Sequence, residues 1–337
     1  MSDNKNLPQK KDSAEVALQK TTSLLSITNK ILANRANRTL VVSDDAWLDE
    51  LIAWADENNI PEKQLPRDKQ AILALTELYL VNNQFTELPE SIGKLTNLTV
   101  LSLAKNQLTK LPESIGKLTN LTVLFLGRNK QLTTLPVFIG NLTNLTRLGL
   151  SDIHFTALPE FIGNLTNLTE LDLDENSFTT LPEFIGNLTK LTNLDLGINK
   201  LTALPEFISN LTNLTKLNLG CNQLTELPEF IGNLTKLTEL NSYNNQLTEL
   251  PKSIGKLTNL IKLDLSNNQL TELPESIGKL TNLIDLNLRD NQLTELPESI
   301  GKLIKLTGLN LSNNQFTEST EFIGKLTNLT NLTVIHW

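Results

Sequence analysis

The sequence is poor in the residues on which most protein chemistry depends. It has one cysteine, Cys221, and two histidines, His154 and His336, among 337 residues. A single cysteine cannot form an intrachain disulfide, which excludes the small secreted modules that depend on such bonds. Two histidines far apart in the sequence offer neither a Cys–His nucleophile pair nor a histidine-rich metal site. We therefore expect no enzymatic activity, no bound metal and no cofactor.

Other absences concern where the chain works and what it binds. No stretch approaches the roughly 18 uninterrupted apolar residues of a membrane-spanning helix. The first residues, MSDNKNLPQKKDS, lack the apolar run of a signal peptide, which predicts a cytoplasmic protein. The formal net charge is −8, whereas nucleic-acid binding favours a basic surface. These features predict no membrane and no nucleic-acid partner, and we expect a monomer.

What the sequence does contain is a strict internal repeat. Leu, Thr and Asn dominate the composition, and the chain has enough apolar residues (39%) to form a core. The first leucine of each LxxL segment recurs every 23 residues, except for one step of 24 between Leu121 and Leu145. Eleven full units occupy residues 75–328 and a twelfth begins at residue 329. Such a period indicates stacked units that share one continuous core.

The pattern within one unit predicts its local structure. Leu263 and Leu265 lie two residues apart, the period of a strand with one buried face. Asn268 follows where the chain must turn, and its amide can satisfy buried backbone groups. Pro274 then opens a short helical turn, whose inner side is buried by Ile277. Because a strand and a compact turn differ in width, we expect the stacked units to curve.

The pattern LxxLxLxxNxLxxLPxxIGKLxx resembles the leucine-rich-repeat superfamily, and within it the 23-residue intracellular type. That type is found in bacterial repeat proteins and in Ras-group scaffolds. The resemblance implies an α/β repeat solenoid: a curved horseshoe with a concave parallel β-sheet and convex short helical turns. It also implies a binding protein, although the same frame serves many partners.

The N-terminal side of the array predicts a helical cap. Residues 43–60 form an amphipathic pattern, with Ser43 as the N-cap and one apolar face that contains Trp47, Leu51, Trp54 and Ala55. An end repeat exposes half a core, so a capping element is needed. Residues 43–74 are therefore predicted to be this cap followed by a degenerate half-repeat.

The two ends of the chain are harder to interpret. Residues 1–42 are a tail in which residues 13–34 predict a peripheral helix, which could pack on the cap, pair with another chain or remain loosely ordered. Residues 329–337 form a terminal partial repeat, in which Trp337 falls at the position of the turn Asn and could cover the core. The chain could also be a fragment of a longer protein.

The positions that the repeat leaves free point outward from the concave sheet and vary along the array. The first repeats present apolar and aromatic residues, which suit a binding anchor, and basic and acidic residues follow. The predicted partner-binding residues are Tyr79, Val100, Val123, Phe125, Arg128, Arg147, Glu170, Asp172, Asp174 and Asp195. Two alternatives remain: neutral drift of exposed positions, and a calcium site among Asp172, Asp174 and Asp195.

Three irregularities interrupt the repeat. One extra residue lies within residues 127–132, and Ile153 replaces the next turn Asn on the same edge of the stack. Either a tolerated surface insertion or a functional loop would explain this pair. Ser242 replaces a core leucine and predicts a packing defect, as do Ser319 and Thr320, which replace Leu and Pro.

The function predicted from these observations is a non-catalytic protein–protein interaction scaffold that binds a protein partner on the concave face. The alternatives are a regulator of small GTPase or kinase signalling, which the Ras-group resemblance suggests, and an exported effector that binds host proteins.

Overall fold

The computed structural model describes residues 45–316 and 331–333. The predictions for residues 1–42, Ser43, Ser319, Thr320 and Trp337 lie outside the described residues. The chain divides into two compact units, residues 1–47 and 48–337, and the repeats belong to the second.

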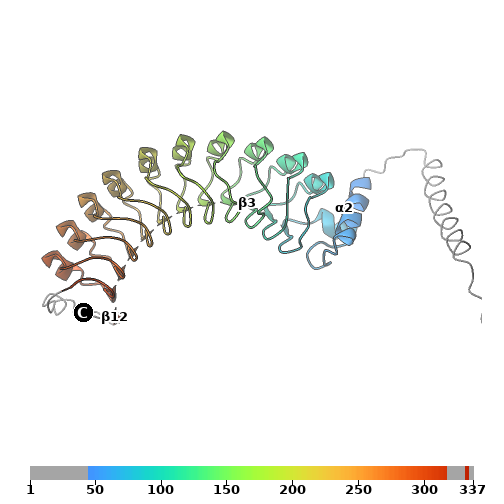
Figure 1. The fold of residues 1–337 in the computed structure, drawn as a ribbon. Coiled ribbons are helices and arrows are strands. Elements are labelled where there is room, and N and C mark those ends of the chain that lie inside the picture. Colours follow the sequence, from blue (N-terminus) through green and yellow to red (C-terminus); the bar gives the residue numbers. More distant parts are fainter. Residues whose placement is uncertain (1–44, 317–330, 334–337) are drawn as a thin grey trace, which may run out of the picture. The chain divides into compact units, whose positions relative to one another are not determined.

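In the second unit each repeat forms one coil, with a strand on one side and a short 3-10 turn on the other (Figure 1). We number the repeats from Leu75 and the positions within each from its first leucine. The strands are β1 Glu77–Tyr79, β2 Val100–Ser102, β3 Val123–Phe125, β4 Arg147–Gly149, β5 Glu170–Asp172, β6 Asn193–Asp195, β7 Lys216–Asn218, β8 Glu239–Asn241, β9 Lys262–Asp264, β10 Asp285–Asn287, β11 Gly308–Asn310 and β12 Asn331–Thr333. The 3-10 turns are η1 Glu90–Lys94, η2 Glu113–Lys117, η3 Val137–Asn141, η4 Glu160–Asn164, η5 Glu183–Asn187, η6 Glu206–Asn210, η7 Glu229–Asn233, η8 Lys252–Lys256, η9 Glu275–Lys279 and η10 Glu298–Lys302.

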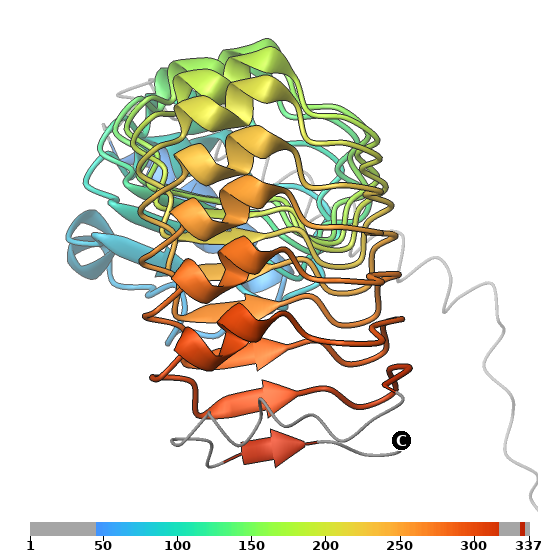
Figure 2. The same ribbon diagram turned by 90° about the vertical axis from the view of Figure 1, so that its left-hand side faces the viewer.

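The strands form a single parallel sheet in chain order from β1 to β12. Equivalent residues pair across neighbouring strands, as Glu77 does with Val100. Figure 2 shows successive strands lying parallel, one per coil. The sheet lines the inner side of the curve and the 3-10 turns line the outer side (Figure 1). The predicted curved solenoid with a concave parallel sheet is confirmed.

The core is a stack of leucine and isoleucine ladders between sheet and turns. In repeat 9 Leu263, Leu265, Leu270, Ile277 and Leu280 are all buried, as the pattern predicted. Burying such side chains contributes about 1.5–3 kcal/mol each relative to exposure. The ladder continues through equivalent positions of the other described repeats, with Ser242 of repeat 8 as an exception, so the core extends along the array.

The N-terminal helix α2 spans Ala46–Glu57, inside the predicted range 43–60. Leu51 and Ala55 are buried as predicted, together with Leu48, whereas Trp47 and Trp54 are half-buried. The Trp54 ring packs edge-on against Phe85 of repeat 1, with 5.2 Å between ring centroids. The cap function predicted for this helix thus has a direct contact with the first repeat.

A short helix, α3 (Lys69–Leu73), occupies the degenerate half-repeat and begins at Asp68, whose side chain accepts a hydrogen bond from Ala71 N. Arg67 ties this segment to α2. Its Nε lies 2.7 Å from Asp56 Oδ1, and its Nη2 donates to Ile60 O at 2.7 Å. One guanidinium can make these contacts together because it has several donors in a fixed plane.

The turn asparagine at position 9 forms a buried ladder beside the sheet. Asn222 Nδ2 donates to Leu196 O and Leu219 O, and its Oδ1 accepts from Leu201 N. Asn268 repeats these three contacts with the equivalent residues. Backbone groups that leave the strand edge inside the protein would be costly to bury without partners. The predicted role of this asparagine is confirmed.

The interruption of the ladder in repeats 3 and 4 is compensated locally. Ile153 is buried at the asparagine position and cannot accept the hydrogen bond that Leu132 N would donate. Leu132 N instead donates to Asn129 O at 2.9 Å, within the turn that holds the extra residue. The extra residue of repeat 3 therefore compensates for the replacement of asparagine by Ile153 in repeat 4. They also lie on the same edge, as the sequence indicated.

The convex turns stack closely because each has a glycine in its fourth position, except η6, which has Ser209. A Cβ on Gly93 would lie 2.3 Å from Ser114 Cβ of the next turn, closer than real atoms approach. Among the described residues no glycine has a positive φ, so close packing and not backbone freedom explains this residue. The IGKL segments of the sequence are turn-stacking elements.

Ser242 is fully buried where other repeats have leucine, and in the described structure its hydroxyl has no hydrogen-bond partner. The predicted packing defect is confirmed.

Candidate functional site on the concave face

Positions 3 and 5 of each repeat form the concave surface. They lie in the strand on either side of the buried leucine at position 4. The ten predicted residues all reach the surface. Tyr79, Arg128 and Arg147 are exposed, and the others are half-buried: Val100, Val123, Phe125, Glu170, Asp172, Asp174 and Asp195.

Five of these residues line one hollow of about 190 Å³ across β3 to β6: Phe125, Arg147, Glu170, Asp172 and Asp195. We call them the concave cluster. Arg147 Nε lies 2.6 Å from Glu170 Oε2, and the Arg147 guanidinium carbon lies 5.6 Å from the centre of the Phe125 ring. The arrangement combines an apolar face, a cation and carboxylates on one small surface.

Gly149 makes room for the aromatic ring of this cluster. A Cβ at Gly149 would lie 2.6 Å from Phe125 Cδ1, so the ring leans over the neighbouring strand. Any larger residue at Gly149 would displace the ring. The position of Phe125 is thus set by two repeats.

The remaining predicted residues lie around the cluster or further along the sheet. Val100 and Val123 pair in register on β2 and β3. Tyr79 lies on β1, 49% exposed, and donates a hydrogen bond to Glu77. Arg128 lies 4.0 Å from Asp152, which also pairs with Lys130 at 3.0 Å. Tyr79 and Val100 do not line the hollow that contains Phe125.

The acidic residues of repeats 5 and 6 crowd one another. Partial burial, followed by repulsion from Asp195, Asp172 and Glu175, raises the pKa of Asp174 to about 6. Burial also raises the pKa of Asp195. Desolvation and like charges both disfavour an ionised carboxylate. A cationic group placed here would relieve that repulsion.

Two of the predicted acidic residues also have a structural role. Asp172 Oδ1 accepts from Asp174 N at 3.1 Å, and Asp195 Oδ1 accepts from Gly197 N at 3.0 Å. Side-chain oxygens of Asp and Asn stabilise turns in this way. Position 5 makes the same contact in repeats 7 to 11, through Asn218, Asn241, Asp264, Asn287 and Asn310.

This turn bond separates the repeats into two groups. Position 5 holds Tyr79, Ser102, Phe125 and Gly149 in repeats 1 to 4, none of which can supply the Asx oxygen. Fold maintenance explains an Asp or Asn at position 5 but does not explain the aromatic residues. Phe125 is therefore a stronger site candidate than Asp172 or Asp195.

The described residues do not support the alternative of a calcium site. Among residues 45–316 and 331–333, no group of three or more His, Cys, Asp or Glu side chains could hold a metal ion. Of the three aspartates, Asp172 and Asp195 are explained by their turn bonds. In the same described part, no helix has the length and apolarity needed to cross a membrane.

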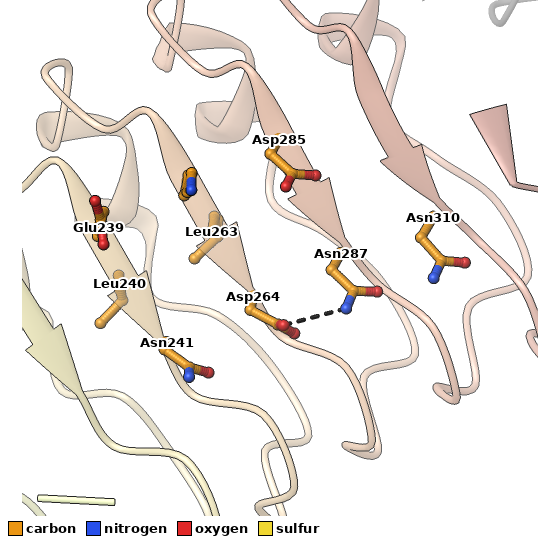
Figure 3. Close-up of a pocket in the computed structure, with 9 residues that line it drawn as sticks. Glu239, Leu240, Asn241, Leu263, Asp264, Asp285, Asn287 and Asn310 are labelled. Carbon is orange, nitrogen blue, oxygen red and sulfur yellow. Dashed lines mark hydrogen bonds between the residues drawn. The ribbon is translucent and has the colours of Figure 1, made fainter. Parts of the chain in front are cut away.

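The sequence interpretation missed a second hollow, of about 360 Å³, on the concave face of β8 to β11 (Figure 3). Leu240 and Leu263 form its floor, and polar residues, among them Glu239, Asp264 and Asp285, surround them; Asn287 Nδ2 donates to Asp264 Oδ2 at 3.1 Å. These repeats looked uniform in sequence because their outward residues are mostly Asn, Asp and Lys. A hollow that forms where the side chains are short cannot be recognised from the residue types alone.

Ile198 is a second feature that the sequence interpretation missed. It is 43% exposed and has φ of 46° at position 8. The equivalent Asn244, Asn267 and Asn313 also have positive φ, which asparagine tolerates far better than a β-branched residue. Among repeats 1 to 11 this is the one β-branched residue at position 8, a departure that was visible in the sequence.

Together, the one-strand coils, the asparagine ladder and the stacked convex turns define a curved repeat solenoid with a solvent-facing concave sheet. The profile of the leucine-rich repeat region matches residues 67–152, 137–243 and 240–337. The chain belongs to the leucine-rich-repeat family, as the sequence resemblance predicted. Proteins of this fold commonly mediate protein–protein interactions and are generally not enzymes.

Solved structures with the same fold come from plants and bacteria. The ectodomain of the receptor kinase GASSHO1/SCHENGEN3 from Arabidopsis thaliana, in complex with CASPARIAN STRIP INTEGRITY FACTOR 2, is 36% identical with a TM-score of 0.66; the match covers 77% of this chain and 33% of that one. A leucine-rich-repeat protein of Leptospira interrogans is 32% identical with a TM-score of 0.51, covering 81% and 87%. The plant peptide hormone receptor RGFR1 in complex with RGF2 is 31% identical with a TM-score of 0.62, covering 77% and 48%.

This chain thus spans about a third of the first of these structures and about half of the plant hormone receptor. The comparison with curated proteins finds no match.

Proposed function

We propose that this chain is a non-catalytic scaffold that binds a protein partner on its concave face, at the concave cluster. One observation carries the proposal: repeats 3 and 4 give up the turn-forming Asp or Asn of position 5 and present Phe125 over Gly149 instead. A half-buried aromatic ring beside an arginine is the composition that binding hot spots favour.

The charges of the cluster suggest how a partner is oriented. Arg147 stands over the Phe125 ring, and the carboxylates of repeats 5 and 6 follow directly along the sheet. A partner surface with an apolar anchor next to a basic group would match this order. Complementary charges contribute to the rate and specificity of association more than to affinity.

Two of the related structures are complexes with another molecule bound to the receptor, which supports a binding role for this chain as well. The 23-residue intracellular type and a cytoplasmic location are part of the same proposal.

The test is affinity capture from the source organism with the full chain as bait, followed by calorimetry with the captured protein. Phe125→Ala and Arg147→Ala are expected to weaken binding by about tenfold or more, as loss of a hot spot does. The matched control is Lys216→Ala, because Lys216 and Glu239 form an equivalent ion pair at 3.0 Å on β7 and β8.

This control should bind like the unmodified chain. If the three variants bind alike, or if Lys216→Ala alone loses the partner, the concave cluster is not the binding site. Thermal unfolding of each variant verifies that the array remains folded.

A further inference from the structure

The edge of the array where the chain enters each strand carries a regular hydrogen-bond ladder. Position 2 is threonine in repeats 1 to 8, and from repeat 2 onward each hydroxyl donates to the carbonyl of position 2 one repeat earlier. The donors are Thr99, Thr122, Thr146, Thr169, Thr192, Thr215 and Thr238. These bonds tie neighbouring coils together at the surface.

Repeats 9 and 10 lack the threonine that forms this ladder. Position 2 is Ile261 and Ile284, 36% and 42% exposed, although the backbone bonds of the ladder persist. Each isoleucine gives up a hydroxyl bond between coils and exposes an apolar side chain to water. The lost hydroxyl bond and the exposed apolar surface both act against stability, although the buried part of each side chain still contributes to it.

The two isoleucines line a groove of about 470 Å³ on this edge, together with Thr238 and the asparagines Asn259 and Asn282. Lysines stand at its two ends in the order of the repeats. Lys236 Nζ donates to Asn213 Oδ1 and Lys305 Nζ donates to Asn282 Oδ1, each at 2.7 Å. Both lysines occupy position 23, where most repeats have asparagine.

The charge of the groove is opposite to that of the chain. Its lining has two lysines and no carboxylate, whereas the whole chain has 37 acidic and 29 basic residues. A small cationic and apolar groove on an acidic protein selects for partners with apolar side chains and carboxylates.

We infer that this edge groove is a second docking site, distinct from the concave cluster, which binds an acidic, apolar segment of a partner polypeptide. Aliphatic side chains of that segment pack on Ile261 and Ile284. Its carboxylates pair with Lys236 and Lys305. The concave sheet remains free while the groove is occupied, because position 2 lies outside the strands.

The repeat itself supplies the variants that test this site. Ile261→Thr with Ile284→Thr restores the residue of repeats 1 to 8, and Lys236→Asn with Lys305→Asn restores the usual residue of position 23. The probe is a fluorescein-labelled peptide of alternating leucine and glutamate, measured by fluorescence polarisation. A peptide of alternating leucine and lysine is the charge control.

The full chain is expected to bind the leucine–glutamate peptide and not the leucine–lysine peptide. The double threonine variant should bind at least about tenfold more weakly. Its urea midpoint should be no lower than that of the unmodified chain, because the regained ladder bonds offset the lost apolar burial. The double asparagine variant should bind more weakly and lose the salt dependence of binding. Phe125→Ala should bind this peptide unchanged, which keeps the result independent of the concave cluster.

Three outcomes would overturn the proposal: no binding of the leucine–glutamate peptide to the full chain, equal binding by the double threonine variant, or equal binding of both peptides. A threonine variant that binds weakly because it is unfolded would show a lower urea midpoint, contrary to the expected result.

Discussion

At the scale of single residues, the repeat assigns most positions a structural duty, and the exceptions mark candidate sites. Position 8 illustrates this, because its φ is positive in every described repeat. Asparagine suits that conformation, and Ile198 does not. The sequence showed a β-branched residue at position 8 in one repeat, Ile198, but only the backbone showed that this position has a positive φ.

Replacing Ile198 with asparagine is therefore expected to stabilise the chain by about 1–2 kcal/mol, the cost of a residue held in an unfavourable backbone region. Urea denaturation measures the gain. The reverse change at the equivalent Asn267, to isoleucine, serves as the control and should destabilise by a similar amount. Equal stability of the Ile198→Asn variant and the unmodified chain would show that φ at this position is not strained.

A second residue-scale prediction concerns Asp174, whose ordinary pKa of 3.8 is raised to about 6 in the folded chain. Between these two values the folded chain binds more protons than the unfolded chain, so the contribution of Asp174 to stability falls as pH rises. Above about pH 6 Asp174 is ionised in the folded chain, and the full free-energy penalty of its burial and of the neighbouring carboxylates applies. Asp174→Asn removes it.

The difference in melting temperature between Asp174→Asn and the unmodified chain should therefore be small at pH 4 and grow in favour of the variant towards pH 7. Thermal unfolding across this range measures it. A difference that stays constant with pH would contradict the raised pKa.

At the scale of elements, the sequence predicted the strand, the asparagine turn and the convex turn of each repeat. These follow from side-chain periods and from the need to satisfy buried backbone groups. It did not predict how the extra residue of repeat 3 and Ile153 of repeat 4 depend on each other. The two changes are linked by the hydrogen bond that Leu132 N donates. In repeats 2 and 4 to 10 the equivalent N–H donates to the asparagine side chain of the next repeat, whereas Leu132 N donates to the backbone oxygen of Asn129.

Deleting Lys130 restores the 23-residue length of repeat 3 and should remove the turn in which Asn129 O accepts from Leu132 N. With Ile153 in place, that buried donor has no side-chain acceptor, so we expect a loss of about 1–3 kcal/mol in the free energy of unfolding. Adding Ile153→Asn to the deletion should recover most of the loss.

Guanidinium denaturation of the single and combined variants measures this rescue. Without recovery in the combined variant, the insertion and the replacement are independent events.

At the scale of the whole molecule, the fold follows from the repeat, whereas the binding sites do not. Eleven near-identical units determine a curved sheet, because each coil can bury its leucines only against its neighbours. All five residues of the concave cluster were among the ten predicted, since Phe125 and Arg147 differ visibly from other repeats, but the sequence did not show which five share a hollow. The hollow over β8 to β11 and the edge groove depend on shape and accessibility between coils, which a residue pattern does not contain.

Hydrogen–deuterium exchange of the full chain, with and without its captured partner, tests most directly whether the concave cluster is the partner-binding site. The account predicts partner-dependent protection in β3 to β5 and in the turns that follow them, residues 121–128, 145–152 and 168–175. Protection confined to the convex turns, with no change in these three segments, would contradict it.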